Sequence, residues 1–209
     1  MKKDILLIAL TENSWLYMGL SALLPEMTCI QMDFSTQLLP QDVNVASRII
    51  IAVDSLILFR GKWDTLNALR ASRPDVSVVW LTWEHTGRAF PVENKGNLIL
   101  DQKQNITTLR CAMRRVAKRS DVNHRDDDHV DVVKLTLTER YLLPRFMSGM
   151  SLSTLSLLTG SPIKSLYTHR QKIMAKTGFR KVVFLQYVYA RNYGLRNVSD
   201  MKPWYKYSI

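Results

Sequence analysis

The polar side chains with the most suggestive spacing lie between residues 162 and 176, in a stretch with the period of an α-helix. On a wheel of about 100° per residue, Ile163, Leu166 and Ile173 fall together and are expected to face a core. The residues expected on the opposite side are Lys164, Thr168, Gln171 and Ala175, with Tyr167 and Lys172 beside them. In the major groove of DNA, Lys reaches guanine acceptors, Gln pairs with adenine and Thr contacts either. This face therefore predicts contacts with base edges.

The flanks of the same helix carry groups suited to phosphates. We expect this role for Ser165, His169, Arg170, Lys172 and Lys176. The alternative is an ordinary solvated helix face, which any small helical domain has. Hydrolase chemistry has no support, because His169 and the nearby serines share one helix with no acid to orient the imidazole. We therefore expect a binding protein and not an enzyme.

The charge of the chain is unevenly divided. The 209 residues carry a net charge of +11. Residues 135–209 hold twelve Lys or Arg against two acids, which places +10 in this third. A segment this basic attracts polyanions, either nucleic acid or, less often, an anionic membrane surface. No apolar run approaches the roughly 20 residues of a membrane span, so the sequence predicts a soluble, cytoplasmic protein.

Three helices are expected to position the polar face. The first opens at residues 138–139 and ends at Gly149, and the second is capped by Ser151. The third has Ser161 as its N-cap and Pro162 at its first helical position. The leucines expected on the inner side of the second helix are Leu152, Leu155 and Leu158. Two helices joined by a tight turn with a glycine match a helix-turn-helix.

The first 119 residues alternate apolar strands with helical stretches. The expected strands span residues 3–10, 47–53, 76–82 and 98–100, and the expected helices span 14–24, 62–72 and 106–119. Continuous apolar strands separated by helices predict an α/β domain, a parallel sheet with helices on both faces. The pattern does not assign residues 28–45.

Residues 120–134 are polar and acidic and are expected to form an interdomain linker. His124 and His129 with the acids between them are the one candidate metal site, but a solvated linker is favoured because a flexible loop does not preorganise ligands.

Cys29 and Cys111 are expected to be buried thiols. No metal or cofactor is expected. The aromatic tail, residues 204–207, is expected to pack on the domain surface or to fray, with docking on DNA or a partner as the alternative.

Residues 135 to about 185 resemble the DNA-binding domain of the LuxR/FixJ/NarL family. The residues at that family's spacing, without a gap, are Leu135, Glu139, Leu143, Gly149, Ser151, Leu155, Leu166, His169, Arg170, Ile173, Lys176 and Gly178. The departures are Ser156 in place of alanine, Thr177 in place of leucine, and the turn at residues 160–162. The resemblance implies that Lys164, Tyr167, Thr168 and Gln171 read bases, and that the helix at 182–191 is a dimer contact.

The strand and helix order of the N-terminal part resembles a receiver domain, the usual partner of this DNA-binding domain. A receiver needs an acceptor Asp, acids that hold Mg²⁺, a hydroxyl and a Lys. Asp54 stands at the acceptor position and Thr82 at the hydroxyl position. The acid positions hold Thr11 and Glu12, and the region of the lysine has no cation until Lys103. The resemblance thus implies a receiver that is defective in phosphorylation.

A defective receiver joined to a complete DNA-binding domain resembles auxiliary regulators of the RcsA/BglJ type. We therefore expect a receiver-like domain at 1–119, a linker at 120–134 and a DNA-binding domain with four helices at 135–209. The expected function is sequence-specific regulation of transcription on double-stranded DNA, as a homodimer or as a heterodimer with an RcsB-like response regulator. One alternative is an adaptor that modulates another regulator without touching DNA. The other is a conventional response regulator phosphorylated on Asp54.

Overall fold

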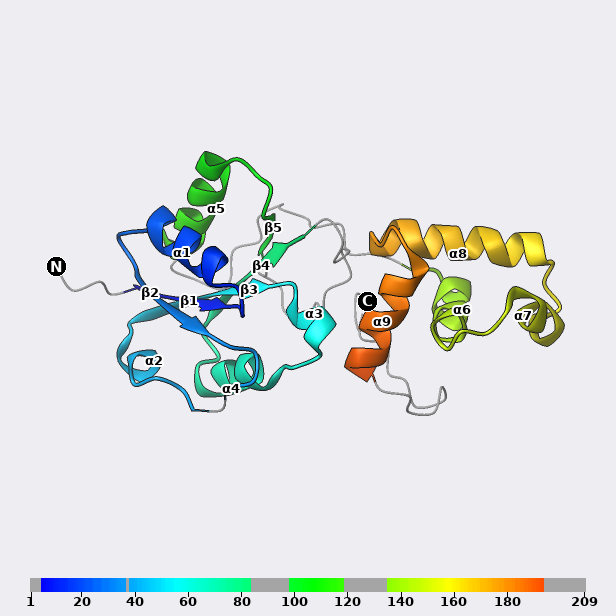
Figure 1. Ribbon diagram of the computed structural model, residues 1–209, viewed down its shortest axis with the longest axis horizontal. Helices are drawn as coiled ribbons and strands as arrows, with labels where there is room; N and C mark the ends of the chain where they lie inside the picture. The colour runs from blue at the N-terminus through cyan, green and yellow to red at the C-terminus, as the bar shows by residue number, and fades with distance from the viewer. Residues whose placement is uncertain (1–4, 37, 84–97, 119–134, 194–209) are drawn as a thin grey trace. The chain divides into compact units, whose positions relative to one another are not determined.

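The computed structural model describes residues 5–36, 38–83, 98–118 and 135–193. These residues belong to two compact units, one holding residues 5–83 and 98–118 and the other residues 135–193 (Figure 1). The expected linker, 120–134, and the aromatic tail, 204–207, lie outside the described residues. Of the helices described, none is both long and apolar enough to cross a membrane.

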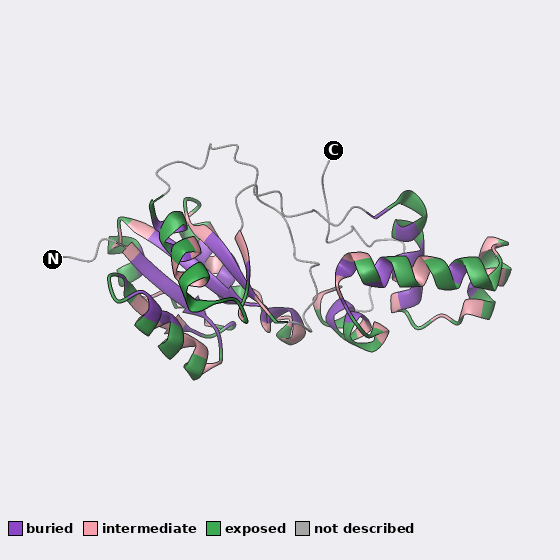
Figure 2. Cartoon of the chain, turned by 90° about the horizontal axis from the view of Figure 1, so that it is seen from above, coloured by how far each residue is buried: buried purple, intermediate pink, exposed green. Residues whose placement is uncertain are grey.

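The N-terminal unit is built on a five-stranded parallel sheet in the order β2-β1-β3-β4-β5. Its strands are β1 (Ile5–Leu10), β2 (Thr28–Met32), β3 (Arg48–Asp54), β4 (Ser77–Thr82) and β5 (Leu98–Asp101). The central strands β1, β3 and β4 are apolar on both faces, and Figure 2 shows them buried over most of their length. That pattern requires helices on both sides of the sheet. The predicted fold class of this unit is confirmed.

Helices cover both faces of the sheet (Figure 1). On one side lie α1 (Ser14–Leu23) and α5 (Ile106–Lys118), and on the other lie α2 (Asp42–Val45) and α4 (Asp64–Ser72). A short helix, α3 (Ile57–Arg60), follows β3. The core beneath α1 and α5 is formed by alternate residues of the strands with inward residues of both helices, among them Leu7, Ile50, Val79, Leu20 and Met113.

Three short elements of this unit escaped sequence prediction. β2 lies at the sheet edge and is buried only at its last residue, so it lacks the continuous apolar run of an inner strand. α2 and α3 have four residues each, too short to display a helical period.

Cys111 is exposed and Cys29 half-buried, so the prediction of two buried thiols is wrong. Cys111 faces outward because the inner side of α5 is occupied by Met113, Val116 and Ala117.

The C-terminal unit contains four described helices. They are α6 (Leu137–Met147), α7 (Leu152–Thr159), α8 (Ile163–Thr177) and α9 (Val182–Tyr193). α6 begins one residue earlier than predicted, because Thr136 is its N-cap and forms a reciprocal capping box with Glu139. Gly149, with φ +79°, follows α6 as predicted, since a left-handed residue after a helix favours glycine. Ser151 caps α7 by accepting a hydrogen bond from the Thr154 amide, also as predicted.

Two predictions, one about the N-cap of α8 and one about the inner side of α7, are wrong. The N-cap of α8 is Pro162 and not Ser161, and it makes no side-chain capping bond. The carbonyl of Ser161 instead accepts a hydrogen bond of 2.7 Å from the Ser156 hydroxyl, which ties the turn to α7. Leu158 is exposed, whereas Leu155 is fully buried. Because α7 has only eight residues, one leucine is enough to anchor its inner side.

Candidate nucleic-acid interface

α8 is held from behind by two apolar side chains. Leu166 and Ile173 are each 1% exposed and pack in the core of the unit, as the helical wheel predicts. Ile163, which was expected beside them, is 50% exposed. Ile163 is the first residue of α8, and the core of the unit is formed without it. Figure 2 shows the outward side of α8 as a largely exposed surface along the whole helix.

The residues predicted to read bases all lie on this exposed side. They are Lys164, Tyr167, Thr168 and Gln171. The Gln171 amide donates a hydrogen bond of 3.0 Å to the hydroxyl of Tyr167, one helical turn away. This bond holds the two side chains together and leaves the Gln171 carbonyl and the Tyr167 hydroxyl hydrogen for a ligand. The Thr168 hydroxyl donates to the backbone carbonyl of Lys164, so its oxygen remains an acceptor.

The residues predicted on the flanks fall into two groups. Ser165 and Lys172 are exposed, as contact with phosphates requires. His169 and Arg170 are half-buried, and the Arg170 guanidinium lies 5.1 Å from the centre of the Tyr167 ring. The Nδ1 atom of His169 and the Nε atom of Arg170 are buried without a hydrogen-bond partner in the described part of the chain. The guanidinium of Arg170 thus packs over the Tyr167 ring on the flank of α8.

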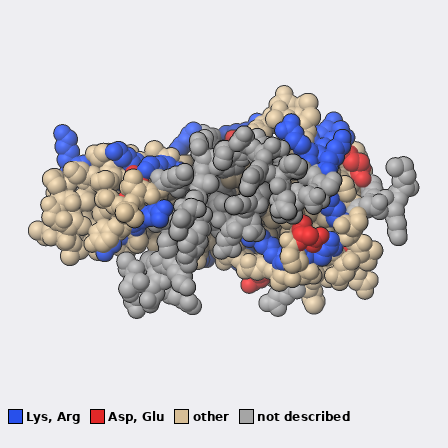
Figure 3. Space-filling view, turned by 180° about the vertical axis from the view of Figure 1, so that it is seen from behind, with Lys and Arg blue, Asp and Glu red and all other residues tan. Residues whose placement is uncertain are grey.

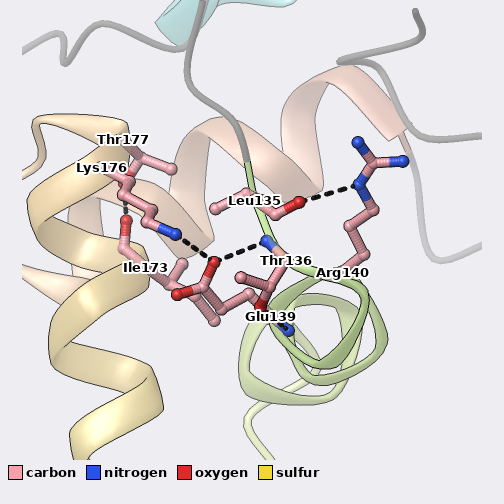
Figure 4. Close-up of polar contacts among 7 residues, drawn as sticks. All are labelled: Leu135, Thr136, Glu139, Arg140, Ile173, Lys176 and Thr177. Atoms are coloured by element: carbon pink, nitrogen blue, oxygen red, sulfur yellow. Dashed lines mark hydrogen bonds and ion pairs between the residues drawn. The ribbon is translucent and has the colours of Figure 1, made fainter. Parts of the chain in front are cut away.

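Lys176 makes a contact that the sequence did not predict. Its ammonium group lies 2.6 Å from a carboxylate oxygen of Glu139, which is 1% exposed (Figure 4). The same oxygen accepts a hydrogen bond of 2.7 Å from the Thr136 amide. Burial raises the pKa of Glu139, but the bonds from Lys176 and Thr136 outweigh it, and the net pKa is lowered. Lys176 thus joins α8 to the start of α6, while the phosphate contact expected of it stays a prediction.

The charge around α8 is overwhelmingly positive. Of the two acids in residues 135–209, Glu139 is neutralised by Lys176 and the other lies outside the described residues. Figure 3 shows Lys and Arg side chains spread over this unit on the face drawn, with little acidic surface among them. A rigid helix with an exposed polar face in such a field has the geometry and sign needed to enter the groove of a polyanionic duplex.

The receiver-like site of the N-terminal unit is filled by neutral groups. Asp54 ends β3 and is fully buried. One of its carboxylate oxygens accepts a bond of 2.7 Å from the Thr11 hydroxyl, and the other accepts one of 3.0 Å from the Leu56 amide. Burial is the main cause that raises the pKa of Asp54, and these hydrogen bonds oppose it. Glu12 is directed to Arg60, with which it forms an ion pair of 2.9 Å.

The other two positions of the resemblance lie at the ends of β4 and β5. The Thr82 hydroxyl donates to the Leu100 carbonyl at 3.2 Å. The Gln102 side chain, after β5, donates to the Leu81 carbonyl and also hydrogen-bonds Asp54. Within the described ranges, no three His, Cys, Asp or Glu side chains come close enough to hold a metal ion. In the described part of the chain, the oxygens of Asp54 are thus bonded to uncharged groups, the Thr11 hydroxyl and the Leu56 amide.

The sequence matches no family model and no curated protein. Its similarity is to solved structures. A complex of the two-component response regulator RcsB with DNA is 13% identical, with a TM-score of 0.56 over 90% of this chain and 98% of that one. A structure of two RcsB dimers bound to two parallel DNAs is 14% identical, with the same TM-score and coverage.

A third solved structure is RcsB from Salmonella enterica serovar Typhimurium bound to promoter P1flhDC with phosphomimetic BeF3⁻. It is 13% identical, with a TM-score of 0.55 over 90% of this chain and 98% of that one. At these identities the likeness concerns the fold alone. The chain thus has the fold of a response regulator, a receiver-like unit followed by a helix-turn-helix unit.

Proposed function

We propose that this chain is a sequence-specific DNA-binding regulator of transcription, and that α8 is its recognition helix. The observation that carries the proposal is the outward face of α8, where Lys164, Tyr167 and Gln171 are exposed while Leu166 and Ile173 anchor the helix. The positive charge of the unit supports it, as does the fold shared with RcsB structures that contain DNA. The chain acts by binding and not by catalysis.

Ile163 extends the proposed reading face beyond the residues that the sequence suggested. Its side chain is half exposed at the first position of α8, one turn before Tyr167. An apolar side chain at the groove end of a recognition helix suits the methyl group of thymine. Ile163 therefore contributes an apolar contact beside the polar ones of Lys164 and Gln171.

A dimer is the proposed active form. α9 buries Leu185 and Val188 in its own unit but leaves Val183 70%, Phe184 37% and Tyr187 44% exposed. An apolar helix side of this kind suits contact with a second helix-turn-helix unit, which would place two recognition helices on successive turns of DNA. The second subunit is either another copy or an RcsB-like response regulator.

The receiver-like unit supports the heterodimer. Asp54 is buried and bonded to Thr11, and by the resemblance to receivers the region of the lysine has no cation until Lys103, so we infer a unit that is defective in phosphorylation. A related regulator that keeps those groups would supply the switch. The same observation favours one further function, an adaptor that alters a partner without contacting DNA.

Footprinting distinguishes a regulator that binds DNA from an adaptor that does not contact it. The purified chain, alone and with an RcsB-like regulator, is tested on promoter DNA by nuclease protection. Protection beyond that given by the partner is expected, with Lys164→Ala and Gln171→Ala each costing about 1–3 kcal/mol at one base position. Lys172→Ala is expected to weaken binding to all sequences and to lower the slope of log K against log salt by about one.

The matched control is Lys62→Ala, which removes one exposed cation from the N-terminal unit. It should leave both the protection pattern and the salt slope close to those of wild type. Protection identical to that of the partner alone would favour the adaptor.

A further inference from the structure

Tyr167 and Gln171 form a hydrogen-bonded pair on the exposed side of α8. They are four residues apart, which places them one helical turn from each other on the same face. The side-chain nitrogen of Gln171 donates a bond of 3.0 Å to the hydroxyl oxygen of Tyr167. Both residues are exposed, Tyr167 by 47%, so the pair lies at the surface of the unit. The bond therefore determines which end of the Gln171 amide is held by Tyr167 and which end is left for a ligand.

The Tyr167 ring is itself held by a second residue of α8. The Arg170 guanidinium lies 5.1 Å from the centre of the ring, within the range of a cation–π contact. Arg170 at the ring and Gln171 at the hydroxyl thus restrict the Tyr167 side chain before a ligand arrives. Side chains that are restricted in advance lose less conformational entropy on binding.

The atoms that Gln171 has left match one base in particular. With one N–H used for Tyr167, the amide keeps its carbonyl oxygen as an acceptor and its second N–H as a donor. In the major groove, adenine presents the complementary pair, the N6 donor and the N7 acceptor. Guanine presents two acceptors, N7 and O6, which would meet the carbonyl oxygen of Gln171 with no hydrogen between them.

A glutamine without such a bond discriminates less between the two purines. The last torsion of its side chain is broad, so the amide turns over readily and presents both N–H groups to guanine. In this chain the same rotation would place the Gln171 carbonyl against the Tyr167 hydroxyl, which would then have to donate its hydrogen to Gln171. The phosphates of a duplex are acceptors and favour that hydrogen for themselves, which leaves the Tyr167 oxygen to accept from Gln171.

We propose that Tyr167 is a positioning residue, which holds the Gln171 amide in the orientation that accepts adenine and rejects guanine at one base pair. The proposal rests on the proposed function, because it requires that α8 enters the major groove. It deepens that function by naming the base that Gln171 reads and the side chain that sets the choice.

The test begins with selection of sites from a random-sequence duplex library by the full-length chain, alone and with an RcsB-like response regulator. The base pair whose preference disappears in Gln171→Ala is the one that Gln171 reads. At that pair, the wild-type chain should bind adenine about 5- to 100-fold more tightly than guanine. Tyr167→Phe keeps the ring but removes the hydroxyl, and it should lower this ratio about 3- to 10-fold.

The ratio of the two dissociation constants distinguishes positioning from a general loss of affinity or stability, which would weaken binding to both duplexes alike. Because Tyr167 acts through Gln171, Tyr167→Phe should have no further effect on the ratio in the Gln171→Ala background. The matched control is Tyr141→Phe in α6. Tyr141 is 49% exposed, with the Arg145 guanidinium 3.6 Å from the centre of its ring, and it would lose the same hydroxyl from a different helix. This control should leave the ratio unchanged.

Three results would overturn the proposal while leaving DNA recognition by α8 in place. They are a wild-type preference for guanine at the pair that Gln171 reads, a ratio that Tyr167→Phe leaves unchanged, and a change that persists in Gln171→Ala. Sequence preference that Gln171→Ala leaves intact at every position would overturn it as well. If no sequence were selected, with or without the response regulator, the proposed function would fail and this inference with it.

Discussion

The hydroxyl of Thr11 donates a hydrogen bond of 2.7 Å to the carboxylate of Asp54, and both side chains are buried. Thr11 follows β1 and Asp54 ends β3, so the bond joins two adjacent strands at their carboxyl ends. In a parallel α/β sheet this edge is where ligands bind. Here a neutral donor of the chain itself occupies the position in which a receiver would place an acid.

Replacing Thr11 by Val should destabilise the N-terminal unit by about 1–3 kcal/mol, because a buried carboxylate oxygen loses its partner. Thr11→Ser keeps the hydroxyl and should cost less than about 1 kcal/mol. Denaturant unfolding, followed by circular dichroism, measures the free energy of unfolding of both variants. Equal stability of the Val and Ser variants would show that the bond contributes nothing.

Incubation of the chain with a small-molecule phosphodonor and Mg²⁺ should produce no phosphoryl adduct by intact mass. The reason is that Asp54 is fully buried and its two carboxylate oxygens accept hydrogen bonds from Thr11 and Leu56. RcsB treated in parallel serves as the positive control. An adduct on the wild-type chain that disappears in Asp54→Ala would restore the conventional response regulator.

The ion pair between Glu139 and Lys176 should make the stability of the C-terminal unit depend on pH. The folded pKa of Glu139 is lowered, so the pair contributes fully above the ordinary carboxyl pKa, and the contribution is lost as the pH falls through the lowered value. Unfolding free energies measured from neutral to acidic pH should decrease through that window. In Glu139→Gln, the decrease should be smaller.

Removing only the cation should be the most damaging change at this site. Lys176→Met leaves a buried carboxylate without its counter-charge and should cost about 2–4 kcal/mol, less than for a fully buried pair because Lys176 is one-third exposed. The double variant with Glu139→Gln and Lys176→Met should recover most of that loss. If Lys176→Met instead lowered DNA affinity with unchanged stability, the original phosphate role would be correct.

Ile163 should read one thymine by its methyl group. Replacing thymines of the bound site one at a time by uracil removes only that methyl, and affinity should fall about 3- to 10-fold at a single position. In Ile163→Ala the same uracil substitution should have no effect, while Tyr167→Phe should keep the wild-type response. A wild-type chain indifferent to every uracil would exclude this contact.

The sequence by itself determined the layered α/β unit, the helix-turn-helix order and the outward position of Lys164, Tyr167 and Gln171. These follow from local patterns. Runs of β-branched residues form buried strands, and a period near 3.6 assigns each side chain an angle around its helix. The anchoring by Leu166 and Ile173 is predicted for the same reason.

Only the tertiary structure decided which residues those side chains contact. The partner of Lys176 is Glu139, 37 residues earlier in the chain, and the donor to Asp54 is Thr11, 43 residues earlier. Ile163 lies at an angle that suits a core, yet at the first residue of α8 its side chain is 50% exposed. A helical wheel predicts the direction in which a side chain points, but not the residues that it contacts. Burial and charge pairing arise when distant segments pack together.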